Sequence, residues 1–347
     1  MKFSAYKYQR PDFPVYQETF KKALANLQSA DTFSEAKQAL DALNELRGTI
    51  DTAMNLASIR YSIDTNDAFY EAEDTFWNEY QPHFEALDFQ FYQALLASPV
   101  LDELKAEYPE TLFLFAESRV KLFDEALIEL FQKENQLASD YSKLVASAQI
   151  DFQGETYTLA QLRPFTENKD RGVRKEAFEK QTAFFTENED RFDQIYDEMV
   201  KVRTEIAHKL GFENYVAFAD TQMNRWDYDR SMIETYRREI LEKVVPITQK
   251  LYQRQAQRNQ LTQATFTDLP LVYPSGNAEP KGTPEELVEK ARVMYQELSP
   301  ETGEFFDFMV EHDLLDLLSK KGKQSGGYCT FIQDYQSPFI FANFNGT

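Results

Sequence analysis

The fold class is decided by residues 233–251, which read IETYRREILEKVVPITQKL. Apolar side chains recur there at steps of 3, 4, 4, 3 and 4 residues, at Ile233, Tyr236, Ile240, Val244, Ile247 and Leu251. Because an α-helix turns once in about 3.6 residues, this spacing predicts a helix with one buried apolar stripe. Pro246 lies inside the stripe and removes a backbone donor, so we expect the helix to bend there.

Further helices are predicted on both sides of this stretch. Toward the N-terminus, a second helical stripe is carried by Leu40, Leu43, Leu46, Ile50 and Met54. Thr32 and Glu35 have the spacing of a capping box at its start. Residues 283–286 (TPEE) and 299–301 (SPE) place a hydroxyl cap before a proline, which predicts two more helix starts. Residues 262–282 are rich in proline and glycine and predict a long connection, of a kind that often serves a site.

Strands are predicted at only two places. Apolar residues alternate about Gln153-Gly154, at Ile150, Phe152, Tyr157 and Leu159, which predicts a short hairpin. Residues 327–332 (GYCTFI) and 339–344 (FIFANF) are rich in aromatic and β-branched side chains and predict two adjacent strands. The predicted fold is therefore mainly α and multi-helical, with one short β-hairpin and a small β-strand pair near the C-terminus.

The composition describes an acidic chain that can fold. It has 58 Asp and Glu against 37 Lys and Arg, a formal charge of −21, and 14% aromatic residues. This charge repels phosphate backbones and anionic membrane surfaces, so neither nucleic acid nor a membrane is an expected partner. No apolar run is long enough to span a membrane, the N-terminus lacks a signal-peptide pattern, and the single Cys329 cannot form an internal disulfide. We therefore expect a cytoplasmic protein.

Sequence motifs for catalysis are absent. The chain contains no Gly-x-Ser-x-Gly, no glycine-rich phosphate loop and no cysteine pair. Its three histidines, His83, His208 and His312, match no local metal-ligand spacing. We expect all three to be structural or surface residues, with His83 at a helix boundary next to Pro82. No catalytic residue and no metal ligand are assigned.

Four segments together point to a family. They are residues 59–73, which begin IRYSIDTND, residues 170–177, residues 202–215, which end LGFENY, and residues 314–347, which include KQSGGYCT and SPFIFANFNGT. These segments resemble the cytoplasmic zinc oligopeptidases of the oligoendopeptidase F and thimet oligopeptidase type. The last segment is the most specific, because in such proteins it directly precedes the active-site helix.

The resemblance implies a zinc-dependent endopeptidase that hydrolyses short peptides with metal-activated water. It places a helical N-terminal lobe at residues 1–190 and the start of the catalytic lobe at residues 191–347. The His-Glu-x-x-His helix of the family, which supplies zinc ligands and the general base, is absent. The ligands are therefore expected beyond Thr347, and a chain truncated there should bind no zinc and be inactive alone. The alternative is an acidic helical scaffold or peptide-binding protein that never carried metal; the oligomeric state and the peptide preference stay open.

The resemblance also suggests where a peptide substrate binds. The matching family segment lies at a sheet edge, so Gly326, Gly327, Tyr328 and Cys329 are the candidate substrate-binding residues. An extended peptide can join such an edge as an added strand, and glycines permit a close approach of the backbone. The alternative is that Gly326-Gly327 only forms a turn into a buried strand, with Cys329 a small buried apolar residue and Tyr328 and Phe341 core aromatics.

The end of the chain carries an apolar strand without charge. Its side chains are those of Phe339, Ile340, Phe341, Ala342 and Phe344. In the family, the zinc helix and later elements cover these faces, so we expect the strand to be exposed, frayed or prone to self-association in this chain.

Overall fold

Helix α2 (Phe33–Ile63) is the central element, and it begins where the sequence predicts. The Thr32 hydroxyl accepts a hydrogen bond from the Glu35 amide, and the Glu35 carboxylate accepts one from the Thr32 amide. The reciprocal bonds satisfy amides that lack partners at the start of a helix. The Leu40 and Leu43 side chains of the predicted stripe are buried between α2 and its neighbours.

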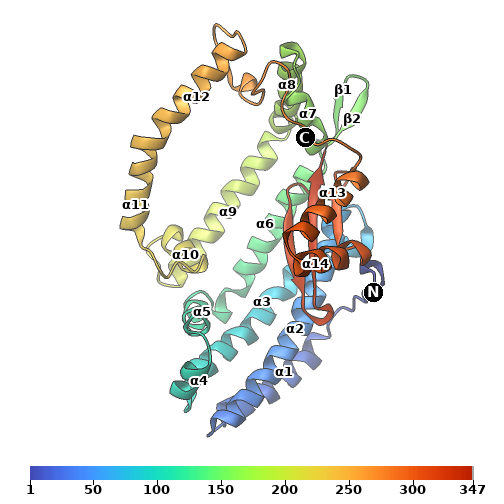
Figure 1. The fold of residues 1–347 in the computed structure, drawn as a ribbon. Helices are drawn as coiled ribbons and strands as arrows, with labels where there is room; N and C mark the ends of the chain where they lie inside the picture. Colours follow the sequence, from blue (N-terminus) through green and yellow to red (C-terminus); the bar gives the residue numbers. More distant parts are fainter. Residues whose placement is uncertain (346–347) are drawn as a thin grey trace.

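The computed structural model describes residues 1–345 and is mainly helical, as predicted (Figure 1). In chain order the helices are η1 (Phe3–Ala5), α1 (Phe13–Gln28), α2 (Phe33–Ile63), α3 (Ala68–Leu96), α4 (Leu101–Glu107), α5 (Glu110–Lys121), η2 (Glu125–Leu127), α6 (Ile128–Ala146), α7 (Leu159–Thr166), α8 (Arg171–Glu187), α9 (Glu189–Lys209), α10 (Tyr215–Gln222), α11 (Arg230–Glu239), η3 (Ile240–Val244), α12 (Val245–Arg258), η4 (Phe266–Asp268), α13 (Pro284–Leu298), α14 (Pro300–Glu311) and η5 (Gln333–Tyr335). None of these helices has both the length and the hydrophobicity that crossing a membrane requires.

Two of the predicted helix starts are confirmed at the C-terminal side. Thr283 caps α13 and Ser299 caps α14, each with a proline at the first helical position and with a complete capping box. The hydroxyl at the cap satisfies an amide of the first turn, and the proline has no amide to satisfy.

The predicted hairpin is present, but it is shorter than expected. Strand β1 (Ile150–Phe152) pairs antiparallel with β2 (Glu155–Tyr157) across Gln153 and Gly154, which both have positive φ. Leu159, predicted to end the second strand, instead begins α7 after the Thr158 capping box. The cap accounts for the difference, because its hydroxyl favours a helix start over continued pairing.

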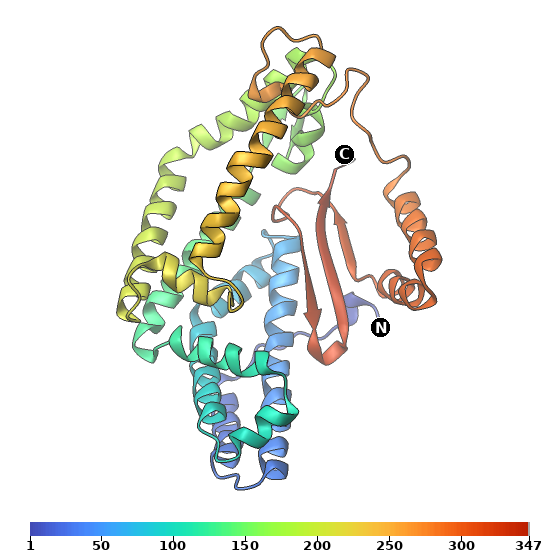
Figure 2. The same cartoon turned by 60° about the vertical axis from the view of Figure 1, so that its left-hand side comes forward.

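The C-terminal sheet has three strands, where the sequence predicted a pair. Strand β5 (Ser337–Phe344) lies between β4 (Tyr328–Ile332), which is antiparallel to it, and β3 (Leu315–Leu318), which is parallel to it (Figure 2). Strand β3 reads LDLL and directly follows α14. So short an apolar run has no strand signature of its own, and only its pairing with β5 makes it a strand.

The expectation of an uncovered C-terminal strand is wrong for one face of β5. Phe339 and Phe341 are buried in a core that also contains Phe3 and Tyr6 of the N-terminal segment and Leu56 of α2. On the opposite face, Ile340, Ala342 and Phe344 are half-buried. Segments distant in sequence therefore cover this strand. Gly346 and Thr347, which end the segment that carries the family resemblance, lie outside the described residues.

The stretch at 233–251 is helical, but its stripe is not buried. Helices α11 and α12 contain no buried residue, and Tyr236, Val244, Ile247 and Leu251 are each more than half exposed. A π-helical segment, η3, joins the two helices directly before Pro246, where the sequence predicted a bend. A π-helical insertion is a common way to disrupt a helix. Periodicity thus predicted the helix correctly and its burial wrongly.

Two other expectations concern His83 and the loop at 262–282. His83 lies inside α3 and not at a helix boundary, since Pro82 is accommodated within that helix. The loop contains η4 and is tied to α8 through Asp268, whose carboxylate accepts hydrogen bonds from Arg171 and Arg174.

Candidate functional site

Strand β4 forms one edge of the C-terminal sheet, as a peptide-binding edge requires. Among the strands of residues 1–345 it pairs only with β5, and Cys329 lies opposite Ile340 in the register. The Ile340 amide donates to the Leu314 carbonyl on the β3 side, at 2.9 Å. Because a residue in a strand directs its N–H and C=O to the same side, Cys329 forms a non-hydrogen-bonded pair with Ile340. The backbone N–H and C=O of Cys329 therefore point away from the sheet.

Helix α2 runs beside this edge and holds β4 in place (Figure 2). The Tyr328 hydroxyl lies 2.6 Å from the Ser62 hydroxyl. The Asn55 side chain donates to the Phe331 carbonyl at 3.3 Å and accepts from the Thr330 hydroxyl at 3.1 Å. Asn55 thus occupies the outer edge at Phe331 and leaves the position of Cys329 open.

The fold itself favours glycine at the two positions before β4. Gly326 has φ of +88°, and a Cβ on Gly327 would lie 3.2 Å from the Phe341 carbonyl oxygen. The Asn343 side chain holds this turn by donating to the Gln324 and Gly326 carbonyls at 2.8 Å each. The strand begins at Tyr328, so the glycines lead into it. Their contact with a substrate stays a prediction.

Tyr328 and Cys329 differ in their surroundings. The Tyr328 ring stacks on the buried Phe341 ring with centroids 4.8 Å apart, and burial raises the pKa of Tyr328 to about 12 against the lowering effect of its hydrogen bond with Ser62. Cys329 is exposed, so the interpretation of this thiol as a small buried residue is wrong. Alternate strand residues face opposite sides, and Tyr328 takes the core side.

Lys323 is a structural residue of this site that sequence reasoning missed. Its ammonium is fully buried and donates to the carbonyls of Asp316 (3.1 Å), Leu318 (2.8 Å) and Ala342 (2.5 Å), as well as to the Asp316 carboxylate. Burial lowers the pKa of Lys323, although its bond with Asp316 opposes that effect. The lysine joins β3 to β5 and anchors the loop that leads into β4. A single lysine in a loop gives no sequence signal of burial, because lysines are mostly exposed.

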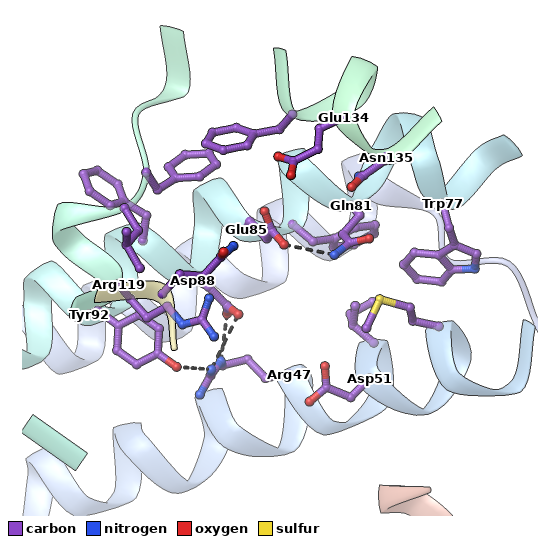
Figure 3. A pocket seen from close by; sticks show the side chains of 18 of the residues that line it. Arg47, Asp51, Trp77, Gln81, Glu85, Asp88, Tyr92, Arg119, Glu134 and Asn135 are labelled. Atoms are coloured by element: carbon purple, nitrogen blue, oxygen red, sulfur yellow. Dashed lines mark hydrogen bonds and ion pairs between the residues drawn. The ribbon is translucent and has the colours of Figure 1, made fainter. Parts of the chain in front are cut away.

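A cavity of about 580 Å³ lies farther along α2, between α2, α3, α5, α6, α9 and α10 (Figure 3). Its walls combine aromatic with charged side chains. Arg47 pairs with Asp88 at 2.7 Å and donates to the Tyr92 hydroxyl at 2.6 Å, and Arg203 pairs with Glu134 at 2.7 Å. The sequence contained no signal for this cavity, since its lining comes from six helices and one connecting segment between residues 47 and 222.

The described residues do not supply a metal site. Within residues 1–345, no three His, Cys, Asp or Glu side chains come together in a way that could hold a metal ion. His208 bonds the Glu213 carbonyl, and His312 caps α14 through the Phe308 carbonyl. No residue here is assigned to zinc.

The chain resembles known peptidases in sequence and in fold. Residues 3–123 match the model of the peptidase M3 N-terminal domain. No match was found among curated protein sequences.

Three solved structures cover 100% of the chain with a TM-score of 0.98 each. One, assigned as an oligoendopeptidase F, is 47% identical; another, PZ peptidase A with an inhibitor, is 45% identical; the third, assigned as an oligoendopeptidase F from Bacillus anthracis, is also 45% identical. The chain spans 61%, 62% and 64% of their lengths, respectively. The N-terminal domain model and the structural matches at 45–47% identity agree, and the chain belongs to the M3 peptidase family.

Proposed function

We propose that this chain is the peptide-binding part of a zinc-dependent oligoendopeptidase that hydrolyses short peptides. The family assignment supports a peptidase and favours it over a metal-free scaffold. Zinc would supply activated water for hydrolysis, with ligands outside the described residues. The division into a lobe at 1–190 and the start of a catalytic lobe at 191–347, and the cytoplasmic location, remain predictions.

The observation that carries the proposal is the open edge of β4 at Cys329. An extended peptide beside β4 would accept a hydrogen bond from the Cys329 N–H and donate one to its C=O, as in strand addition. These bonds involve only the peptide backbone, so they orient a substrate without selecting its sequence. Asn55 at Phe331 limits how far the added strand can extend along the edge.

The test is Cys329→Pro, with Cys329→Ala as its matched control. Proline at 329 removes the outward N–H but no bond of the β4–β5 ladder, and strand edges tolerate proline in this position. We expect Cys329→Pro to weaken the binding of fluorescein-labelled, acetylated heptapeptides at least tenfold in fluorescence anisotropy. Cys329→Ala, which removes the thiol and keeps the N–H, should bind as the unchanged chain does.

Two results would contradict the proposal. Equal binding by Cys329→Pro and the unchanged chain, with equal far-UV circular dichroism, would show that the edge is not used.

Separately, the coding sequence beyond Thr347 should encode a His-Glu-x-x-His helix, and the longer protein should lose peptide hydrolysis on chelation and regain it with zinc. A longer protein that has neither the His-Glu-x-x-His helix nor zinc-dependent peptide hydrolysis would favour the alternative of a metal-free scaffold.

A further inference from the structure

We infer that the cavity in Figure 3 is a subsite for a positively charged group of the peptide, such as a lysine or arginine side chain, held by Asp51 and Glu85. The inference rests on the proposed function, because the cavity would receive part of a peptide bound at β4. It adds a selectivity that backbone bonding at the strand edge cannot provide.

The position of the cavity relative to β4 is the first argument. Asp51 lines the cavity and lies four residues before Asn55 on α2, so the two side chains share one helix face. Asn55 contacts Thr330 and Phe331 of β4. The part of the cavity lined by Asp51 is therefore about one helical turn along α2 from the residue that contacts β4, a separation that a long side chain of an edge-bound peptide can bridge.

The charge of the lining is the second argument. Its four acids are Asp51, Glu85, Asp88 and Glu134, and its three bases are Arg47, Arg119 and Arg203. Asp88 and Glu134 are neutralised by Arg47 and Arg203. This leaves two carboxyl groups, Asp51 and Glu85, against Arg119 alone. The excess is acidic, as is the whole chain at −21, and both favour a cation.

The cavity walls also suit the uncharged part of a long basic side chain. Trp77, Phe84, Phe89, Tyr92 and Phe123 supply aromatic surface. Lysine and arginine bury their methylene stems on such surfaces, and their cationic heads are attracted to aromatic faces. A volume of about 580 Å³ lies within the range of small-ligand pockets.

The state of the two carboxyl groups agrees with a missing partner. Burial raises the pKa of Glu85, and the hydrogen bond from the Gln81 amide at 3.0 Å and the charge of Arg119 only partly oppose this. Asp51 is exposed, but its partial burial and then the charge of Asp88 raise its pKa against the opposing charge of Arg47. Figure 3 shows the Asp51 side chain projecting from α2 into the space faced by α3. A bound cation would stabilise the ionised form of both groups.

The experiment compares N-acetyl-arginine amide with N-acetyl-citrulline amide, which has nearly the same shape but no charge. Binding to the full 347-residue chain is measured by NMR titration and by tryptophan fluorescence, to which the cavity residue Trp77 and Trp226, which does not line the cavity, contribute. We expect the arginine probe to bind at least tenfold more tightly. Asp51→Asn with Glu85→Gln should reduce its affinity to that of citrulline, whereas Asp197→Asn, which removes one carboxylate on α9 outside the cavity, should leave it unchanged.

The outcomes separate this inference from the proposed function. Cys329→Pro should weaken peptide binding and leave arginine-probe binding intact, because the probe does not need the strand edge. Equal affinity for the two probes, no binding of either, or tighter binding of N-acetyl-glutamate amide through Arg119 would each overturn the inference. Loss of probe binding in Asp197→Asn would also overturn it, by showing a general charge effect.

Discussion

At the residue scale, Asp268 is a buried carboxylate held by several hydrogen bonds. Its carboxylate is 1% exposed and accepts hydrogen bonds from Arg171 at 2.9 and 2.8 Å, from Arg174 at 3.0 Å and from the Thr265 amide at 2.9 Å. Burial alone would raise the pKa of Asp268, but the bonds from Arg171, Thr265 and Arg174 outweigh it and lower the pKa. This carboxylate joins the long loop to α8.

We predict that Asp268→Asn lowers the free energy of unfolding by about 3–5 kcal/mol, because it leaves the buried Arg174 without a charged partner. Urea denaturation measures it. Asp197→Asn, which breaks an exposed pair with Lys201, should change stability by less than about 0.5 kcal/mol. If Asp268→Asn and Asp197→Asn both change the free energy of unfolding by the same small amount, the hydrogen bonds of Asp268 add no net stability.

The contribution of Asp268 to the free energy of unfolding should decrease as the pH is lowered. A carboxyl whose folded pKa lies below its unfolded value of about 3.9 stabilises the fold fully above that value, and the contribution is lost as pH falls through the folded pKa. The difference between Asp268→Asn and the unchanged chain should therefore be constant from about pH 5 to 7 and shrink below about pH 4. A difference that grows in acid would contradict the assignment.

At the element scale, the apolar stripe of α11 and α12 has helical periodicity without burial. Ile247 is 58% exposed and Leu251 is 53% exposed, four residues apart on one face of α12. We predict that Ile247→Lys with Leu251→Lys changes the free energy of unfolding by less than about 1 kcal/mol, as surface substitutions usually do. This double variant should also bind less of an apolar dye than the unchanged chain does, because two exposed apolar side chains have been replaced.

The control for the stripe is Leu43→Ala in α2, where the side chain is fully buried. That change should cost about 2–5 kcal/mol through lost contacts and the cavity it leaves. If the double lysine variant costs as much as Leu43→Ala in urea denaturation, the stripe is covered in solution, for instance by a second copy of the chain. Sedimentation at several concentrations would then show the association.

At the scale of the whole molecule, burial is divided among separate cores. One core joins α1 to α5, another joins the N-terminal segment, α2, α14 and the sheet, and a third joins α6, α9 and α10. By contrast, α11, α12 and α13 contain no buried residue.

We predict that native-state hydrogen exchange is slowest in α2 and α3 and fastest in α11 to α13, because local opening costs least where few apolar contacts are lost. Strand β5 should be protected like α2, since Phe339 and Phe341 are both 1% exposed. Mass spectrometry of exchanged peptides measures this order. Slow exchange in α12 together with fast exchange in β5 would contradict the described packing.

What the sequence by itself determined is local. The helix caps at Thr32, Thr283 and Ser299 and the turn at Gln153-Gly154 were predictable because the residues that bond there lie within a few positions of one another. The candidate residues at 326–329 came from family resemblance, and only the register of β4 against β5 showed which backbone groups point outward.

Tertiary structure decided what each apolar or charged side chain faces. Lys323 is buried and the Cys329 thiol and the apolar stripe of α12 are exposed. Residues 315–318 (LDLL) form a strand because they pair with β5, and Asp51 and Glu85 line the same cavity. Periodicity reports that a helix has an apolar face, but burial needs a partner surface supplied by residues far along the chain. Such long-range contacts leave no local pattern, which is why the helices could be predicted and the cavity between them could not.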